Sequence, residues 1–283
     1  MKIYDCFNFF NELDILEIRL NILYDHVDHF VIVESDLTHS GNNKNFFLEE
    51  NMERFSKFKD KIISFKITDN PEDFNNLKPT KDVELLKIYH YINNTSRFNR
   101  STQPDYGRDF FQKESVRRAL VNCDDDDIII FSDVDEIPNP EIFETLNDLN
   151  LDENIYSLQQ RMFYYFINVQ KNCDWYGSRI GKYKNMKNQP FNEIRGNPAL
   201  SVKIENCGWH FSFMGGRKMV ESKLLAYCHN DMVYDKVLTE LDNNMKNNID
   251  PFFRDTLQEV EIDSTYPKYL LDNLNKYENL IKS

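Results

Sequence analysis

The sequence predicts an α/β fold in which a mainly parallel sheet is covered by helices on both faces. Short runs rich in β-branched and aromatic residues recur at residues 2–10, 29–34, 61–67 and 124–131. Apolar residues at helical spacing separate these runs, and this alternation is typical of parallel sheets. The chain has 283 residues, 41% of them hydrophobic and 14% aromatic, which is enough to bury a substantial core.

The chain opens with a strand and a helix. Residues 2–10 are predicted as the first strand, and residues 12–24 as a helix because four leucines recur there at helical spacing. The second strand, residues 29–34, ends in the carboxylate of Glu34 and precedes a polar, turn-rich segment. Glu34 is therefore a nucleotide contact at a strand end, or else a helix cap or a solvated loop residue.

The next segment is the least regular one. Residues 61–67 predict a third strand, but residues 68–103 are rich in Asn, Pro and charge. There we expect a helix near residues 83–92, followed by a mobile loop. Residues 109–122 predict an amphipathic helix that leads directly into the next strand.

That strand carries the strongest candidate for chemistry. The apolar run Ile128-Ile129-Ile130-Phe131 ends in two carboxylates, Asp133 and Asp135, which alternation along extended backbone places on one face. Ligands of open α/β sheets bind outside the carboxyl ends of the strands. Two hard oxygen ligands there suit Mg²⁺ or Mn²⁺. The alternative is a simple turn with a helix cap ahead of the helix expected near Glu141.

The second half predicts one more buried strand and helical ends. Residues 155–169 are dense in aromatics, and Arg161 in this apolar run needs a charged partner, for which a sugar or a diphosphate would serve. Residues 171–198 are predicted as loops over the edge of the sheet, and residues 268–281 as a last helix. We expect a single domain over residues 1–283, with a helical extension at about 219–283.

Charge and cysteine content limit the function classes. The chain has 34 basic and 47 acidic residues, a formal charge of −13, which disfavours nucleic-acid partners and anionic membranes. A nucleotide diphosphate can still bind if a divalent ion screens it. The five cysteines lack metal-site spacing. No signal peptide or membrane span is visible, so a soluble, cytoplasmic protein without a membrane anchor is expected.

A second candidate site is Gly208-Trp209-His210-Phe211-Ser212. A lone histidine is more often structural, but imidazole is also a common metal ligand, and the indole of Trp209 can stack on a sugar face.

Four stretches resemble one family. Residues 127–138 resemble the Asp-X-Asp-Glu-Ile-Pro segment of glycosyltransferase family 17, known for β-1,4-mannosyl-glycoprotein β-1,4-N-acetylglucosaminyltransferases. The opening residues 3–14, together with residues 30–35, are similar to the amino-terminal block of that family. Residues 208–212 and 266–271 resemble its carboxyl-terminal blocks. The matches run in order along nearly the whole chain.

The resemblance implies a GT-A-like, nucleotide-sugar-binding fold and an inverting, metal-dependent transferase. The implied donor is UDP-N-acetylglucosamine, the acceptor is a glycan or glycoprotein, and the cofactor is Mn²⁺ or Mg²⁺. Asp133, Asp135 and His210 are the expected metal ligands. Further candidates for binding donor or substrate are Asp5, Glu34, Arg108, Asp109, Arg161 and Trp209.

The general base must reach an acceptor hydroxyl on the side of the sugar opposite the diphosphate, so it should not be a metal ligand. Asp231 is preferred because it lies at a helix end near His229, and a similarly placed Asp occurs in the matching segment of the family. Glu136 and Glu221 remain alternatives. Two other function classes also stay open: a metal-dependent phosphoesterase or nucleotidyltransferase, and a sugar-binding module without catalysis.

Overall fold

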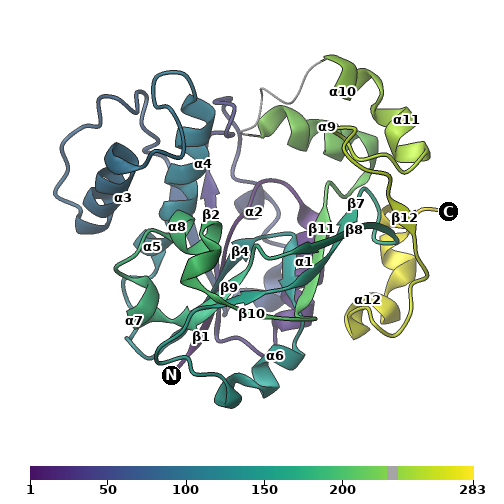
Figure 1. The fold of residues 1–283 in the computed structure, drawn as a ribbon, viewed down its shortest axis with the longest axis horizontal. Helices are drawn as coiled ribbons and strands as arrows, with labels where there is room; N and C mark the ends of the chain where they lie inside the picture. The colour runs from purple at the N-terminus through teal and green to yellow at the C-terminus, as the bar shows by residue number, and fades with distance from the viewer. Residues whose placement is uncertain (228–234) are drawn as a thin grey trace.

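The computed structural model describes residues 1–227 and 235–283 and has the expected α/β fold (Figure 1). Its main sheet has the strand order β10-β6-β9-β4-β1-β2-β3. The strands are β1 (Ile3–Asn8), β2 (His29–Ser35), β3 (Ile62–Ile67), β4 (Ile128–Asp133), β6 (Tyr156–Leu158), β9 (Arg179–Lys182) and β10 (Val202–Ile204).

The four strands from the first half of the chain are parallel. β1 pairs in parallel with β2 and β4, and β2 pairs in parallel with β3, whereas β9 is antiparallel to both of its neighbours. Asn8 is the register partner of Asp133, so β1 and β4 end side by side. The carboxyl ends of the central strands therefore form one edge on which ligands are expected.

Both faces of this sheet are buried, as its apolar strands require. Ile128 and Ile130 of β4 pack into one core, and Ile129 and Phe131 pack into the other. Helices on the first face are α1 (Leu13–Leu23), α2 (Phe47–Glu50), α6 (Glu141–Glu144) and α12 (Lys268–Asp272). Helices on the second face are α3 (Val83–Asn94), α4 (Pro104–Glu114), α5 (Val116–Ala119), α7 (Tyr183–Met186) and α8 (Phe191–Gly196).

A second sheet, of order β12-β8-β7-β11-β5, begins where β4 ends. The chain leaves the first sheet at Asp133 and enters the second at Glu136, so the motif turn joins the two sheets. Its strands are β5 (Glu136–Pro138), β7 (Gln160–Tyr164), β8 (Val169–Trp175), β11 (Gly208–Ser212) and β12 (Gln258–Glu259). A third core lies between this sheet and helices α9 (Gly216–Ala226), α10 (Asp235–Thr239) and α11 (Leu241–Lys246).

Several expected elements differ from the structure. Residues 171–198, predicted as loops, contain most of β8 together with β9, α7 and α8. The expected strand 155–169 is divided between the two sheets, as β6 and β7, and its last residue begins β8. The expected helix 109–122 is two helices that meet at Ser115, and the last helix continues after Asn273 as a 3₁₀ helix, Leu274–Leu280. In the described residues, no helix is long and apolar enough to cross a membrane.

Candidate active site

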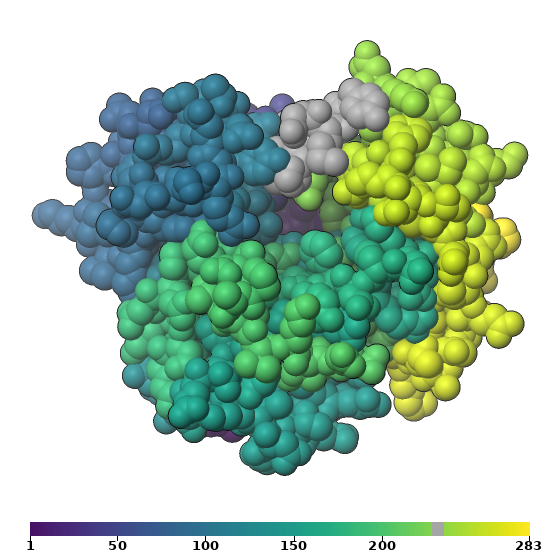
Figure 2. Space-filling model, viewed as in Figure 1, coloured from purple at the N-terminus to yellow at the C-terminus, as the bar shows by residue number. Residues whose placement is uncertain are grey.

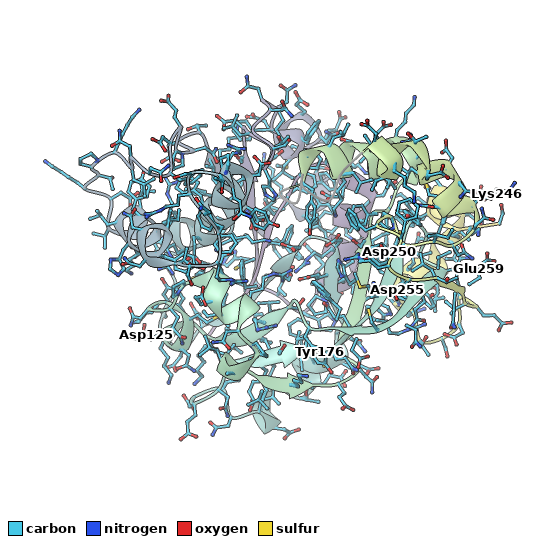
Figure 3. All side chains as sticks on the ribbon, turned by 45° about the horizontal axis from the view of Figure 1, so that its top comes forward. Asp125, Tyr176, Lys246, Asp250, Asp255 and Glu259 are labelled. Atoms are coloured by element: carbon cyan, nitrogen blue, oxygen red, sulfur yellow. The ribbon has the colours of Figure 1, made fainter. Side chains whose placement is uncertain are left out.

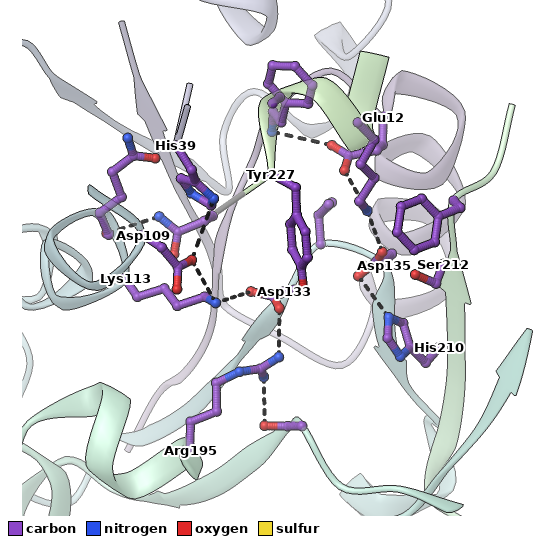
Figure 4. A pocket seen from close by; sticks show the side chains of 18 of the residues that line it. Glu12, His39, Asp109, Lys113, Asp133, Asp135, Arg195, His210, Ser212 and Tyr227 are labelled. Carbon is purple, nitrogen blue, oxygen red and sulfur yellow. Dashed lines mark hydrogen bonds and ion pairs between the residues drawn. The ribbon is translucent and has the colours of Figure 1, made fainter. Parts of the chain in front are cut away.

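A cavity of about 760 Å³ opens where the carboxyl ends of β1, β2 and β4 meet the second sheet. Asn8, Leu37 and Asp133 line it from the first sheet and the loops that follow it, and His210 and Trp175 from the second sheet. Figure 2 shows the surface hollowed at its centre, between the blue α3–α4 region, the green strands and the yellow C-terminal part. The strand-end carboxylates predicted from the sequence both face this cavity (Figure 4).

Arg19 of α1 holds the turn that carries the carboxylates through hydrogen bonds to its backbone. Arg19 is completely buried and donates two hydrogen bonds to Asp5, at 2.8 and 2.5 Å. Its guanidinium also donates to the carbonyl oxygens of Asp133 (2.8 Å), Val134 (3.2 Å) and Glu136 (2.9 Å). A guanidinium presents its donors in a rigid fork, so one side chain defines the path of the whole turn.

Asp133 lies against two cations. Arg195 Nη2 donates to its Oδ2 at 2.6 Å, and Lys113 Nζ is 3.9 Å from its Oδ1. Burial alone would raise the pKa of Asp133, but Arg195 and Lys113 outweigh it and hold the pKa below its usual range. Asp133 is therefore a carboxylate at neutral pH.

Arg195 is oriented in turn by Glu136. The two form a bidentate pair with both N–O distances at 2.6 Å, and Glu136 also accepts hydrogen bonds from Trp175 Nε1 and, at 3.0 Å, from the Asp133 backbone N–H. Gly177 makes this packing possible, because a Cβ there would lie 2.0 Å from Glu136 Oε1.

Asp135 has different partners, Lys223 and His210. Lys223 Nζ of α9 donates to Asp135 Oδ2 at 2.7 Å, and His210 Nε2 is 3.4 Å from Asp135 Oδ1 (Figure 4). Burial would raise the pKa of Asp135, but Lys223 and His210 outweigh it and lower the pKa strongly. His210 reaches this position because β11 pairs with β5, in the register His210 to Glu136.

Among the six candidates for donor or substrate binding, only Asp109 lines the cavity, where it contacts His39 and Lys113. The others have structural partners. Asp5 pairs with Arg19, and Glu34 accepts hydrogen bonds from Lys44 and from the first backbone N–H groups of α2, which is the helix-cap alternative. Arg108 donates to the carbonyl oxygen of His39 and to Asp105. Arg161 donates to Thr265 and Gln170, and Trp209 to the carbonyl oxygen of Thr265.

The base candidates lie in three different settings. Glu136 is fully buried under Arg195 and Trp175. Glu221 pairs with Arg217 at 2.8 Å on α9 and does not line the cavity. Asp231, the preferred candidate, lies outside the described residues.

Sequence reasoning missed the cations of the site. Lys113, Arg195 and Lys223 come from α4, α8 and α9, and no spacing pattern links them to the motif. The available signal was indirect: a buried carboxylate pair needs positive partners. The described lining residues include seven lysine or arginine side chains but only four carboxylates, although the whole chain carries a charge of −13. The cavity is thus the locally basic part of an acidic protein, and it suits an anionic ligand.

Arg254, one of these lining cations, is held by an acidic residue in the C-terminal part of the chain. Arg254 donates to the fully buried carboxylate of Asp250, which also contacts Lys171. Figure 3 shows Asp250 and Asp255 close together in this part of the molecule.

Asp135 and His210 fit a divalent ion as a pair. Two ligand atoms about 2.1 Å from one ion and 3.4 Å from each other subtend an angle of about 110° at the ion, which is an acceptable coordination angle. Asp133 is held by Arg195 and Lys113 instead. Within residues 1–227 and 235–283, no three His, Cys, Asp or Glu side chains form a metal-binding group. Water and phosphate oxygens would complete the shell.

Residues 1–250 match the model of glycosyltransferase family 17. No curated protein sequence matches the chain significantly. Among solved structures, the crystal structure of S. aureus TarS 1–349 matches with a TM-score of 0.40 and 11% sequence identity, covering 80% of this chain. The match covers 64% of the TarS chain, so this protein spans less than two thirds of that length.

Proposed function

The chain belongs to glycosyltransferase family 17, and from that premise we propose that it transfers N-acetylglucosamine from a UDP-sugar to a glycan hydroxyl, with inversion at the anomeric carbon. The observation that carries this proposal is the placement of Asp133 and Asp135. Asp133 ends the central strand of a mainly parallel sheet, Asp135 follows in the next turn, and both face a basic cavity in an acidic protein. A nucleoside diphosphate supplies the negative charge that such a cavity is built to receive.

Different residues of the cavity would bind the diphosphate and the sugar of the donor. Lys113, Arg195 and Lys223 supply positive charge beside the two carboxylates, where a leaving diphosphate develops its charge. Trp175 offers a fixed aromatic face, because its Nε1–H is bound to Glu136 and its ring lies 4.9 Å from that of His210. An aromatic face of this kind stacks well on a sugar ring.

A bound Mn²⁺ or Mg²⁺ would act as a Lewis acid that neutralises the leaving diphosphate. Asp135 and His210 are the residues that would hold the ion, as their 3.4 Å separation supports. Asp133 would remain available for hydrogen bonds to the donor.

His210→Ala should weaken the Mn²⁺-dependent binding of UDP by about tenfold or more, because half of the protein ligand pair is lost. Isothermal titration calorimetry with UDP, with and without Mn²⁺, measures this. His90→Ala is the matched control, since His90 is exposed on α3 and does not line the cavity. Unchanged UDP affinity in His210→Ala would return His210 to a structural role.

Asp231→Asn should lower turnover by about 10²-fold while donor binding stays near wild type, since a base acts on the acceptor and not on the donor. Steady-state rates and UDP affinity measure the two effects. Asp152→Asn is the control, because Asp152 pairs with lysines on the exposed surface and does not line the cavity. Normal turnover of Asp231→Asn together with loss in Glu136→Gln or Glu221→Gln would transfer the role to the residue that failed.

A panel of nucleotide sugars incubated with Mn²⁺ and a mixture of glycan acceptors tests the proposed activity. We expect UDP release to be greatest with UDP-N-acetylglucosamine and to increase when the acceptor is present. Phosphate release that is independent of acceptor would favour a phosphoesterase. Binding without any release would favour a sugar-binding module.

A further inference from the structure

Lys223 lies between two carboxylates that come from distant parts of the chain. Its Nζ is 2.9 Å from Glu12 Oε1, at the start of α1, and 2.7 Å from Asp135 Oδ2. The side chain lines the cavity and is largely buried. Lys223 therefore supplies a positive charge that two carboxylates hold in place.

This ammonium occupies the place that a divalent ion would need. A cation held by Asp135 Oδ1 and His210 would lie within a few ångströms of Lys223 Nζ, which is bound to the other oxygen of the same carboxylate. Two cations at that separation in a buried site repel each other strongly. Asp135 therefore cannot bind a divalent ion and at the same time keep its ion pair with Lys223 unchanged.

The ammonium of Lys223 has other acceptors within reach when it leaves Asp135. A lysine carries its charge on a flexible four-carbon stem with three rotatable donors. Its helix begins at the Gly215–Gly216 pair, whose φ angles of +97° and +78° are readily adopted only by glycine. Glu12 holds the ammonium at the cavity wall when Asp135 releases it, and a diphosphate in the cavity offers new acceptors.

We propose that Lys223 is the counterion of Asp135 in the metal-free protein. A divalent ion displaces Lys223 from Asp135, and the ammonium of Lys223 then binds the diphosphate of the donor. The second half of this inference rests on the proposed function; the first half does not. The exchange gives the enzyme an order of events. Without a divalent ion the carboxylate is neutralised internally, and with the ion the released ammonium adds a second positive charge to the leaving group.

Titration of Mn²⁺ alone into the protein, without nucleotide or sugar, tests the displacement. Lys223→Met keeps most of the length of the unbranched side chain and removes the competing charge, so the dissociation constant for Mn²⁺ should fall by about tenfold. Arg97→Met is the matched control. It also removes one positive charge from the cavity lining, but Arg97 contacts Asn192 and Glu193 and not Asp133 or Asp135. Its Mn²⁺ affinity should change far less.

Three results would overturn the displacement: equal gains in both variants, no gain in Lys223→Met, or no Mn²⁺ binding by any variant. If Lys223→Met alone does not fold, the double variant Glu12→Gln/Lys223→Met removes the whole ion pair and is expected to show the same gain. Since no sugar transfer is measured, a chain that lacks the proposed activity can still pass this test.

Titration of UDP at saturating Mn²⁺ tests the second half, because only the bound ion releases the ammonium from Asp135. Lys223→Met should bind UDP about tenfold more weakly than wild type, because the ammonium that would bind the diphosphate is gone. Equal UDP affinity in the two proteins would overturn the role of Lys223 at the diphosphate.

Discussion

Asp135→Asn should reduce sugar transfer by about 10³-fold, the scale of loss found when a group that stabilises developing charge is removed. Asparagine keeps the shape of the side chain but cannot hold a divalent ion through a charged oxygen. The rate of UDP release with UDP-N-acetylglucosamine, Mn²⁺ and acceptor measures the loss. Full activity of the variant in chelator-treated protein would exclude a metal at Asp135.

The fold of Asp135→Asn should be retained. Lys223 keeps its second partner Glu12, so no buried ammonium is left unpaired. Asp152→Asn is the matched control, because Asp152 also pairs with lysines but lies on the exposed surface. We expect wild-type turnover for it, and for both variants a cooperative unfolding transition by circular dichroism.

The sequence predicted the first four strands closely because their signal is local. Runs such as Ile128-Ile129-Ile130-Phe131 are apolar on both faces, and only a buried strand satisfies such a pattern at that length. The strand 169–175 was missed because most of its residues are exposed or half-buried and polar, as expected near the edge of a sheet. The helix expected at 109–122 is broken at Ser115, whose hydroxyl donates to the carbonyl oxygen of Phe111.

In the site, too, positions set by sequence neighbours could be predicted, whereas contacts with residues distant in the sequence could not. Asp133 and Asp135 lie at the end of a strand as expected, because that position can be predicted from neighbouring residues. Trp209 and Arg161 were expected at the donor, but both donate to Thr265, which no local pattern connects to them. Asp5 was misplaced for a related reason: an acid in the middle of a buried strand needs a buried cation, and Arg19 supplies it from the next helix.

Arg19 leads to the prediction with the largest effect on stability. Arg19→Met should lower the free energy of unfolding by about 3–5 kcal/mol, the cost of leaving one member of a buried ion pair without its partner. Asp5 is fully buried, so the variant would leave its carboxylate away from solvent and without the guanidinium. Denaturant unfolding monitored by circular dichroism measures the change. Arg54→Met is the control, since Arg54 also pairs with two acids, Asp14 and Glu17, but is about one-third exposed. Its loss should cost less than about 1 kcal/mol.

The double variant Asp5→Asn/Arg19→Met separates two roles of Arg19: neutralising the buried charge of Asp5, and holding the backbone of the turn between the two sheets. Removing the buried charge of Asp5 should restore part of the lost stability, because the uncompensated carboxylate is gone. Transfer activity should nevertheless stay low, since the carbonyl oxygens of Asp133, Val134 and Glu136 still lack their donor and the turn between the two sheets is no longer fixed. Misplacement of a charged group by about 1 Å is enough to cost about 10²-fold in rate. If the double variant regains full turnover, the position of the carboxylates is set by the strands alone and Arg19 serves only the core.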